Sequence, residues 1–407
     1  MPFLFSSRIK NKYIPSSIRI KGKWNNIDYL LWLIPIFLVF ISGLLIASTQ
    51  RQANYADWYN HWITGGIGML IAFALSLIPL ERIKPCLIPI YIITLSSLVA
   101  VKFFGTSALG AQRWLSIAGF NVQPSELAKL TAIITLASVL ENFRIENPID
   151  LIRPVSVIVL PWMFVFIQPD LGTSLVFAAI LLSMLYWNGM PLEWILLILS
   201  VLFTAIFSGI VPWVLWIWIP LIGCIAYRSF LYKWRAYLIS VIFHIAIAFA
   251  TPWFWTNVLR DYQRDRLVLF LDPGQDPLGG GYHLLQSIVG IGSGGLWGTG
   301  ILNGQLTKLR FIPEQHTDFI FSALGEEMGF IGTIIVLFLF FLLTIRLLKL
   351  AKNARTDFES LIVIGVLTMF IFQVIVNINM TIGLGPVTGI PLPFMSYGRT
   401  ALLVNFI

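Results

Sequence analysis

Long apolar runs recur along almost the whole chain, and they limit it to one class of fold. The first covers residues 29–48, the length of a complete membrane span. Inside a bilayer the backbone must satisfy its own hydrogen bonds, so such runs are helices. We therefore expect an all-α, polytopic membrane helical bundle. The further runs lie at about 62–80, 87–103, 125–141, 155–168, 171–187, 194–209, 211–227, 236–256, 319–345 and 360–379.

A last apolar run begins near residue 397 and stops at Ile407, so we expect a final helix that is truncated here. Counting this run gives twelve segments. Hydrophobic residues make up 57% of the chain and charged residues only 11%, against about 25% in soluble domains. The sequence therefore predicts a single integral membrane domain over 29–407, preceded by a basic cytoplasmic segment over 1–28.

Basic residues set the expected orientation. They fall before the first run and then in alternate connections, which the positive-inside bias places in the cytoplasm. The net charge of +8 does not suggest nucleic-acid binding, because the basic residues flank apolar runs and form no single patch. These residues are Arg82, Lys84, Arg144, Arg153, Arg228, Lys233, Arg235, Arg346, Lys349, Lys352 and Arg355.

The connection at about 257–317 then lies outside and is much longer than its neighbours. Long connections are usually functional or disordered, and this one is not of low complexity. Its glycines and prolines predict short interfacial helices joined by tight turns. The glycine cluster at 290–295 is not a dinucleotide fingerprint, because no strand precedes it.

Residues 310–329 crowd charges against the start of an apolar run, and charges at such places are usually functional. With a helix from about Asp318, the side chains of Asp318, Ser322 and Glu326 share one face and form a plausible proton-handling site. The alternative is a solvated helix start whose acids complement the helix dipole. The charged residues are Arg310, Glu314, His316, Asp318, Glu326 and Glu327.

Two shorter connections each place a proline at a probable first helical position, followed by Glu126 or Asp170 in the first turn. Glu126 and Lys129 are spaced to pair on one helix face, either as a structural lock between helices or as a substrate contact. Arg113 adds a cation at headgroup depth. Residues 383–398, rich in proline and glycine, cannot form a regular helix and should fold back against an outer cavity.

Several separated motifs resemble the SEDS family (shape, elongation, division, sporulation), and more closely its RodA branch than its FtsW branch. They cover nearly the whole chain in the family's order. The motifs are Gly110-Ala-Gln-Arg-Trp114, Gln123-Pro-Ser-Glu-Leu-Ala-Lys129, Gln168-Pro-Asp-Leu-Gly-Thr173, Asp261-Tyr-Gln-Arg264, Asp276-Pro-Leu-Gly-Gly-Gly-Tyr-His283, Pro313-Glu-Gln-His-Thr-Asp-Phe319, Gly325-Glu-Glu327 and Pro391-Leu-Pro-Phe-Met-Ser-Tyr-Gly398.

The resemblance implies a peptidoglycan glycosyltransferase of the bacterial cytoplasmic (inner) membrane, used in cell-wall elongation and shape maintenance. It would polymerise lipid II at the outer face. Its expected partners are a class B penicillin-binding protein that crosslinks the strands and other membrane proteins of the elongation complex. The family's proposed catalytic aspartate falls on Asp318, and its paired acid and lysine fall on Glu126 and Lys129.

The chain departs from the family pattern at two places. A SEDS fold has about ten spans, whereas residues at about 190–256 hold three apolar runs where one is expected. This predicts a two-helix insertion, which leaves the long connection outside. The family's Ser-Tyr-Gly-Gly reads Ser396-Tyr-Gly-Arg399 here, so Arg399 could meet a lipid diphosphate or pair with a nearby acid.

The implied reaction displaces a diphosphate from an anomeric carbon with inversion, and the acceptor hydroxyl needs a base, for which we assign Asp318. The leaving undecaprenyl diphosphate requires cations or a divalent metal, Mg²⁺ or Mn²⁺, held by Glu126, Asp170 and Glu326. No organic cofactor is expected. The candidate cations are Arg113, Lys129, Arg264, Arg266 and Arg310, and further candidate substrate contacts are Glu314, His316 and Ser396.

Two other functions fit parts of the pattern. A transporter, such as a flippase for the same lipid-linked precursor, also has polar residues in spans and broken helices. Transporters place their ionisable groups near the bilayer midplane, whereas most of these lie at the outer rim. A scaffold without chemistry would leave the acidic cluster unexplained. The enzyme is therefore the favoured interpretation.

Overall fold

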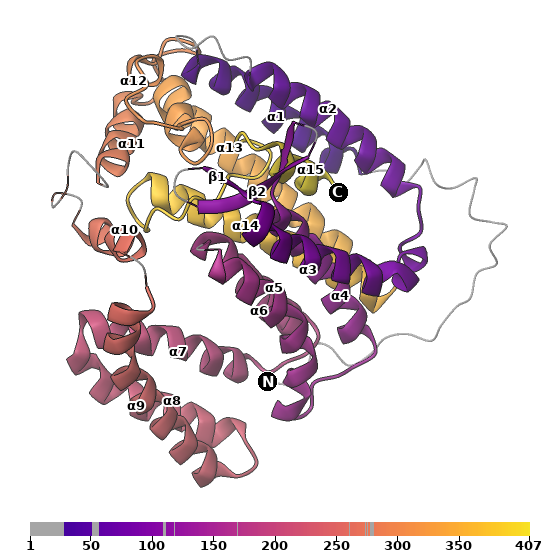
Figure 1. The fold of residues 1–407 in the computed structure, drawn as a ribbon, viewed down its shortest axis with the longest axis vertical. Coiled ribbons are helices and arrows are strands. Elements are labelled where there is room, and N and C mark those ends of the chain that lie inside the picture. Colours follow the sequence, from indigo (N-terminus) through magenta and orange to yellow (C-terminus); the bar gives the residue numbers. More distant parts are fainter. Residues whose placement is uncertain are drawn as a thin grey trace.

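The computed structural model describes residues 28–50, 57–108, 111–117, 119–168, 170–259, 261–272, 274, 276 and 281–407. Within them the predicted all-α bundle is confirmed, with one small sheet in the connection between α3 (Leu87–Phe104) and α4 (Pro124–Glu141) (Figure 1). The basic segment expected over 1–28 lies outside the described residues, apart from Asp28. So do Gly110, Pro169 and residues 277–280 of the family motifs.

All twelve predicted apolar runs lie on helices. Seven stretches are long and apolar enough to cross a membrane by length and composition, and α6 is a shorter apolar helix. The helices are α1 (Tyr29–Thr49), α2 (Asp57–Ser76), α3 (Leu87–Phe104), α4 (Pro124–Glu141), α5 (Ile152–Ile167), α6 (Leu171–Trp187), α7 (Leu192–Ile210), α8 (Leu215–Ser229), α9 (Lys233–Asn257), α13 (Ile320–Lys352), α14 (Asp357–Thr381) and α15 (Arg399–Phe406).

The long outer connection folds as the sequence predicts, into short helices joined by turns. These are α10 (Asp261–Leu271), α11 (Tyr282–Ser293) and α12 (Gln305–Lys308). Short 3-10 turns occupy Leu80–Arg82, Lys84–Cys86, Pro148–Leu151 and Pro212–Val214. The connection between α3 and α4 was not predicted to contain strands. It forms an antiparallel sheet of β1 (Thr106–Ala108), β2 (Ala111–Ile117) and β3 (Phe120–Val122), with β2 in the middle.

The core of the bundle is formed around α14, which packs against α4, α6 and α13. A glycine allows the closest of these approaches. A Cβ placed on Gly365 of α14 would lie 2.5 Å from Ile133 of α4 and 3.0 Å from the sulfur of Met184 on α6. Small residues bring membrane helices close in this way, since dispersion contacts replace the hydrophobic effect within a bilayer. Side chains such as Leu136 and Phe177 are fully buried there.

Three helices, α7, α8 and α9, occupy the region in which the sequence predicts three apolar runs and a two-helix insertion. They stand apart from the rest of the bundle at the lower left of Figure 1. Of the 25 residues of α9, only His244 is buried. Most side chains of this helix are therefore available to lipid.

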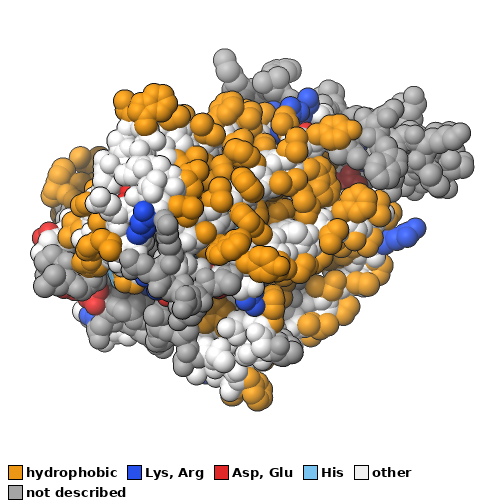
Figure 2. Space-filling view, turned by 90° about the horizontal axis from the view of Figure 1, so that it is seen from above, with side chains coloured by type: hydrophobic (Ala, Val, Ile, Leu, Met, Phe, Trp, Pro, Cys, Tyr) orange, Lys and Arg blue, Asp and Glu red, His pale blue; other side chains and the backbone are white. Residues whose placement is uncertain are grey.

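The outer surface of the bundle is suited to a bilayer. In the face shown by Figure 2, hydrophobic side chains cover most of the surface, with few charged groups between them. On α1 and α2 the exposed residues include Leu33, Phe40 and Leu70. An apolar surface this extensive marks a membrane protein, because soluble monomers rarely expose contiguous patches of this size.

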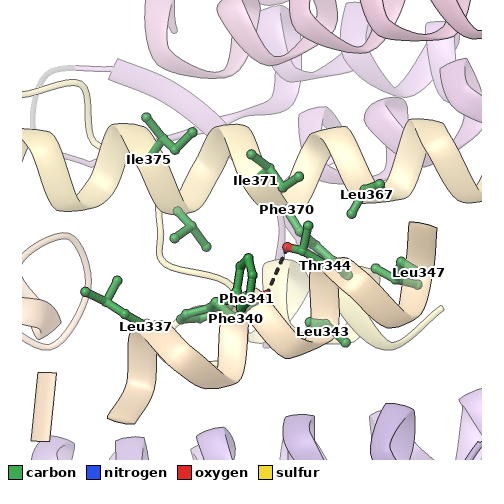
Figure 3. A pocket seen from close by; sticks show the side chains of 11 residues that line it. Leu337, Phe340, Phe341, Leu343, Thr344, Leu347, Leu367, Phe370, Ile371 and Ile375 are labelled. Atoms are coloured by element: carbon green, nitrogen blue, oxygen red, sulfur yellow. Dashed lines mark hydrogen bonds between the residues drawn. The ribbon is translucent and has the colours of Figure 1, made fainter. Parts of the chain in front are cut away.

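A small cavity of about 150 Å³ lies between α13 and α14 (Figure 3). Its lining is apolar except for Thr344, whose hydroxyl donates to the Phe340 carbonyl at 2.9 Å. None of its lining residues is ionisable. This cavity therefore belongs to helix packing and offers no group for acid–base chemistry.

One kink shapes the end of α13 that lies against the long connection between α9 and α13. Gly329 interrupts α13 with φ 64° and ψ −164°, and a Cβ there would lie 2.3 Å from the nitrogen of Gly298. Residues 295–300 of the outer connection fill the break. Phe330 N donates to Gly295 O at 2.9 Å, and Thr299 N donates to Glu326 O at 3.0 Å. Only glycine satisfies both the positive φ and the close approach.

Candidate active site

Asp318 lies in the turn immediately before α13, where it is half-buried. The helix starts at Ile320, two residues later than expected. The carboxylate lies against the 383–398 segment, since a Cβ placed on Gly389 would be 3.4 Å from Asp318 Oδ2. This segment, predicted to fold back against the outer region, therefore forms one wall around Asp318.

Two hydrogen bonds hold the backbone on either side of Thr317. Asn377 Nδ2 of α14 donates to the Asp318 carbonyl at 2.9 Å and also to the Ile390 carbonyl at 2.8 Å. The Tyr397 backbone N–H donates to the His316 carbonyl at 2.9 Å. Asn377 is fully buried and thus joins the Asp318 turn directly to the 383–398 segment.

The groups around Asp318 shift the pKa of its carboxyl in opposite directions. Burial raises the pKa of its carboxyl to about 6, against the cations of Arg266 and Arg113, which lower it. The charges of Asp170 and Glu314 add to the rise. A carboxylate with a pKa near 6 is unprotonated at neutral pH yet more basic than an ordinary aspartate. Such a group is suited to general-base catalysis.

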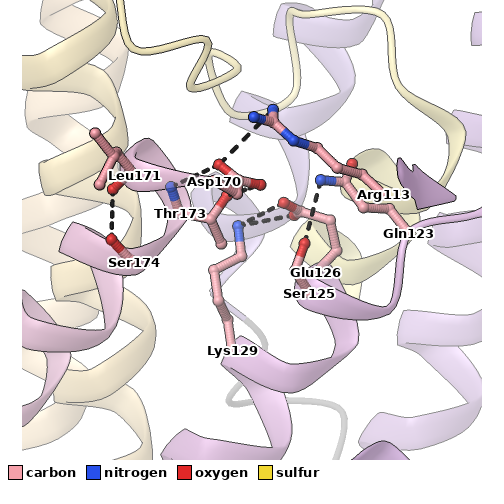
Figure 4. A network of polar contacts seen from close by, with 9 residues as sticks. All are labelled: Arg113, Gln123, Ser125, Glu126, Lys129, Asp170, Leu171, Thr173 and Ser174. Carbon is pink, nitrogen blue, oxygen red and sulfur yellow. Dashed lines mark hydrogen bonds and ion pairs between the residues drawn. The ribbon is translucent and has the colours of Figure 1, made fainter. Parts of the chain in front are cut away.

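Arg113 and Asp170 form the second part of the site. Arg113 lies on β2, and its Nη1 is 3.9 Å from Asp170 Oδ1. Asp170 also caps α6, accepting from Thr173 N at 3.2 Å and from Thr173 Oγ1 at 3.0 Å (Figure 4). The cap satisfies helix amides that would otherwise lack partners, and it fixes the carboxylate in front of the arginine.

Glu126 and Lys129 form a buried ion pair on the first turns of α4, as the sequence predicts. Lys129 Nζ lies 2.9 Å from Glu126 Oε1 and 2.8 Å from Oε2. Their side chains are 2% and 1% exposed. Since α4 packs against both α6 and β2, this pair and the Arg113–Asp170 pair belong to one region (Figure 4).

Glu326 has a different environment from the one expected. Its carboxylate accepts from Leu306 N at 2.8 Å, Thr307 N at 2.9 Å and Thr307 Oγ1 at 2.6 Å. These contacts fix α12 to α13. The expected face shared by Asp318, Ser322 and Glu326 does not form, because Asp318 precedes the helix and Ser322 Oγ donates to the Ser287 carbonyl at 3.2 Å.

The remaining candidate residues differ in their exposure and in their partners. Arg310 is exposed, and its Nε donates to the Thr49 carbonyl at 3.3 Å. His316 Nε2 lies 3.7 Å from Glu314 Oε2, and burial lowers the pKa of His316. Ser396 Oγ accepts from Leu392 N at 2.7 Å and shapes its own turn. Arg264 is half-buried on α10.

The residues proposed for a metal do not come together as a set. In the part of the chain that the structure describes, no three His, Cys, Asp or Glu side chains are grouped to hold an ion. Glu326 uses both carboxylate oxygens on α12, and Glu126 is occupied by Lys129.

Two features of the site were not assigned from the sequence. One is Asn377, for which the sequence does contain a signal, because an asparagine inside an apolar run indicates a buried polar role. Asp57 was not considered. Its Oδ1 accepts from Tyr397 OH at 2.9 Å and its Oδ2 accepts from Gln50 Nε2 at 2.6 Å, which ties α2 to the 383–398 segment.

Comparison with known proteins decides the family. The sequence profile of the FtsW, RodA and SpoVE family, described as cell cycle proteins, matches residues 25–218 and 222–407. The chain belongs to this family. The SEDS resemblance read from the separated motifs is therefore confirmed, and it covers nearly all of the chain.

Curated relatives of this SEDS chain carry one activity in their names. The peptidoglycan glycosyltransferase RodA of Treponema pallidum is 32% identical over 419 residues, covering 95% of this chain and 96% of the relative. The peptidoglycan glycosyltransferase MrdB of Escherichia coli K12 is 37% identical over 389 residues, covering 94% and 92%.

Solved structures share the fold of this SEDS chain. One, described as structural coordination of polymerization and crosslinking by a peptidoglycan synthase complex, matches with a TM-score of 0.70 and 27% identity over 94% of this chain and 95% of that chain. The rod shape determining protein RodA of Thermus thermophilus matches with a TM-score of 0.61 at 24% identity, over 94% of both chains, and supports the fold alone.

The buried Glu126–Lys129 pair predicts an asymmetric response to substitution. Glu126→Ala leaves the Lys129 ammonium buried without its partner, which costs roughly 3–5 kcal/mol. Exchanging the charges in a Glu126→Lys, Lys129→Glu double variant restores the pair and should recover thermal stability and part of the activity. Melting temperature and glycan polymerisation are measured for each. Equal loss in the single and double variants would indicate direct contact with substrate instead.

Asn377→Ala should lower the turnover number of the enzyme about tenfold or more, with little change in KM. It removes the hydrogen bonds that join the Asp318 carbonyl to the Ile390 carbonyl through Asn377 Nδ2, and misplacement of a catalytic group by about 1 Å can cost about a hundredfold. The matched control is Asn379→Ala, because Asn379 Nδ2 donates only to Ile375 O of its own helix, at 2.8 Å. Similar losses in both variants would refute a positioning role for Asn377.

Proposed function

We propose that this SEDS chain is a peptidoglycan glycosyltransferase that polymerises lipid II into glycan strands. Family membership and the names of the relatives support this activity. The observation that carries it is the Asp318 carboxyl, whose pKa burial raises to about 6 beside the cations of Arg266 and Arg113. A base next to fixed positive charge is what transfer of a sugar from a lipid diphosphate requires.

In the proposed reaction Asp318 takes the proton from the acceptor sugar hydroxyl as its oxygen attacks the anomeric carbon of the donor. The bond from that carbon to the diphosphate breaks, and undecaprenyl diphosphate leaves with the electron pair. Arg113 and Arg266 would stabilise its developing charge, with Arg264 and Arg310 as further cations on the same side. Lys129 acts through Glu126, to which it is bound.

The roles of a metal and of the remaining polar residues follow from this arrangement. We propose that any Mg²⁺ or Mn²⁺ enters with the diphosphate of the substrate, because Glu326 is committed to α12. Asp170 orients Arg113. Glu314 and His316 border the acceptor side of the Asp318 turn, and Ser396 preserves the shape of the facing segment.

The proposed partner is a class B penicillin-binding protein that crosslinks the glycan strands, together with other membrane proteins of the elongation complex. Its support is the similar solved structure, whose description couples polymerization with crosslinking in one synthase complex. The chain itself is a multi-pass membrane protein. We propose that it lies in the bacterial cytoplasmic membrane with its N-terminus inside and Asp318 facing outward.

A lipid-precursor flippase is the alternative, and the break in α13 is its best support, since transporters build their sites at discontinuous helices. Here the break is closed. Residues 295–300 of the outer connection satisfy it with backbone hydrogen bonds, and Glu326 and Glu327 are bound to protein donors. A transporter would need these groups available to substrate, so the enzyme is favoured.

Asp318→Asn should give a folded, membrane-inserted protein that binds its partner but does not polymerise lipid II. The amide preserves the size of the side chain and cannot accept the hydroxyl proton at neutral pH, which costs about a hundred- to ten-thousand-fold in rate. Purified protein with labelled lipid II measures this. The control is Glu327→Gln, which should be milder. In the parental chain the Glu327 carboxylate accepts from Ser48 Oγ and Leu302 N, so it has protein partners of its own. Parental activity in Asp318→Asn would remove Asp318 as the base.

The same assay across pH tests the environment of Asp318. A base is active when unprotonated, so the rate should fall as the pH drops through about 6, the pKa that burial gives this carboxyl. This fall in rate near pH 6 should be absent from the residual activity of Asp318→Asn. A rate that declines only near pH 4, the range of an ordinary aspartate, would contradict the burial of this group.

Orientation is tested with single cysteines in a chain whose exposed Cys86 and Cys224 are replaced by serine. A membrane-impermeant thiol reagent added to intact cells should label Gln305→Cys on α12. It should label Lys352→Cys, at the other end of α13, only after the membrane is opened. The reverse pattern would place Asp318 inside and exclude polymerisation at the outer face.

A further inference from the structure

The three helices of the insertion are joined to one another by hydrogen bonds. His244 Nε2 on α9 lies 2.8 Å from Ser200 Oγ on α7, and Trp218 Nε1 on α8 donates to Thr204 Oγ1 on α7 at 3.0 Å. Such polar pairs hold helices together within a bilayer. The three helices form one unit, whose main neighbour in the rest of the bundle is α6, which contacts α7.

An apolar groove of about 720 Å³ separates this unit from the 3-10 turn at Pro148–Leu151, which precedes α5. Its walls include Leu197 and Val201 of α7 and Ile239 and Phe243 of α9. The volume is in the range of small-molecule sites. The polar lining residues are Tyr232, Arg235, Ser240 and His244, and the other walls are apolar. Because water requires several polar partners, a hydrocarbon chain is the occupant that suits the apolar walls.

One end of the groove is positively charged. Arg235 and Tyr232 line it near the start of α9, and the guanidinium lies 5.5 Å from the tyrosine ring centre, within cation–π range. Lys233 adds a second cation on the same turn. No lining residue is an aspartate or glutamate. The neighbouring Asp150 accepts from the backbone N–H groups of Glu146 and Asn147 at 3.0 and 2.8 Å.

We propose that this groove binds an anionic phospholipid, with an acyl chain along α7 and α9 and the headgroup phosphate at Arg235. Positive-inside orientation puts this end of α9 at the cytoplasmic leaflet, where anionic lipids are concentrated. Basic pockets between membrane helices bind such headgroups, and arginine matches a phosphate with paired donors. The proposal concerns the inserted helices and does not depend on the glycosyltransferase reaction.

The test uses the purified full chain, stripped of lipid in detergent, and measures bound lipid by native mass spectrometry. Phosphatidylglycerol should bind more tightly than phosphatidylcholine. Arg235→Gln should weaken phosphatidylglycerol about fivefold, which corresponds to about 1 kcal/mol for one interfacial cation. It should weaken phosphatidylcholine less, because the choline cation of that lipid already balances its phosphate. Val201→Trp fills the groove and should weaken both lipids. The matched control is Lys349→Gln, an exposed cation on α13 that does not line the groove.

Three outcomes would overturn the proposal. Equal binding of phosphatidylglycerol to Arg235→Gln and the parental chain would remove the headgroup site. An equal loss in Lys349→Gln would mean general surface electrostatics. An Ile239→Cys variant that crosslinks to a second copy of the chain, in membranes and at parental expression, would make the groove a contact between protomers. Arg235 is exposed, so its replacement should leave folding intact, which the elution volume of the variant checks.

Discussion

The outer part of this protein depends on buried hydrogen-bond donors that hold irregular backbone against a helical bundle. Inside a bilayer an unpaired carbonyl costs several kcal/mol, so non-helical segments persist only where protein groups satisfy them. Asn377 satisfies two such carbonyls, because its amide nitrogen donates to both Asp318 O and Ile390 O. Gly172, at the start of α6, packs against Ile390. The 383–398 segment that Asn377 holds therefore lies next to the helix that Asp170 caps.

The break in α13 extends this principle to the outer connection. The kink at Gly329 leaves backbone groups of α13 without partners inside the helix, and the backbone of residues 295–300 forms hydrogen bonds with them. Glu326 then anchors α12 through three donors. A connection that the sequence could describe only as long and punctuated is thus built into the helix that follows Asp318. The acids of α13 serve this construction, whereas Asp318, the proposed base, precedes the helix.

The sequence is informative where one physical effect dominates and less so where several compete. Apolar length decides a membrane helix, so all twelve helical segments follow from the runs of residues. Spacing on α4 also predicts the Glu126–Lys129 pair, because both partners lie on one regular helix. The sheet around β2 was not foreseen, because its strands are short and depend on each other for pairing. The expected position of Glu326 on one face with Asp318 was wrong, because it required Asp318 to lie on the helix. Asp318 lies in a turn before α13, and Asn377 and Tyr397, which are distant in sequence, hold that turn.

The raised pKa of Asp318 results from a balance of burial and neighbouring charges, to which Asp170 contributes. Two arginines beside a carboxyl would ordinarily depress its pKa and make it a poor proton acceptor. Burial works against them, and Asp170 adds a negative charge of its own that also raises the pKa of Asp318. Asp170 holds Arg113 at 3.9 Å while its own position is fixed by the cap on α6. In the proposed reaction Arg113 can therefore face the diphosphate without fully neutralising the base, and one small region serves both the leaving group and the proton.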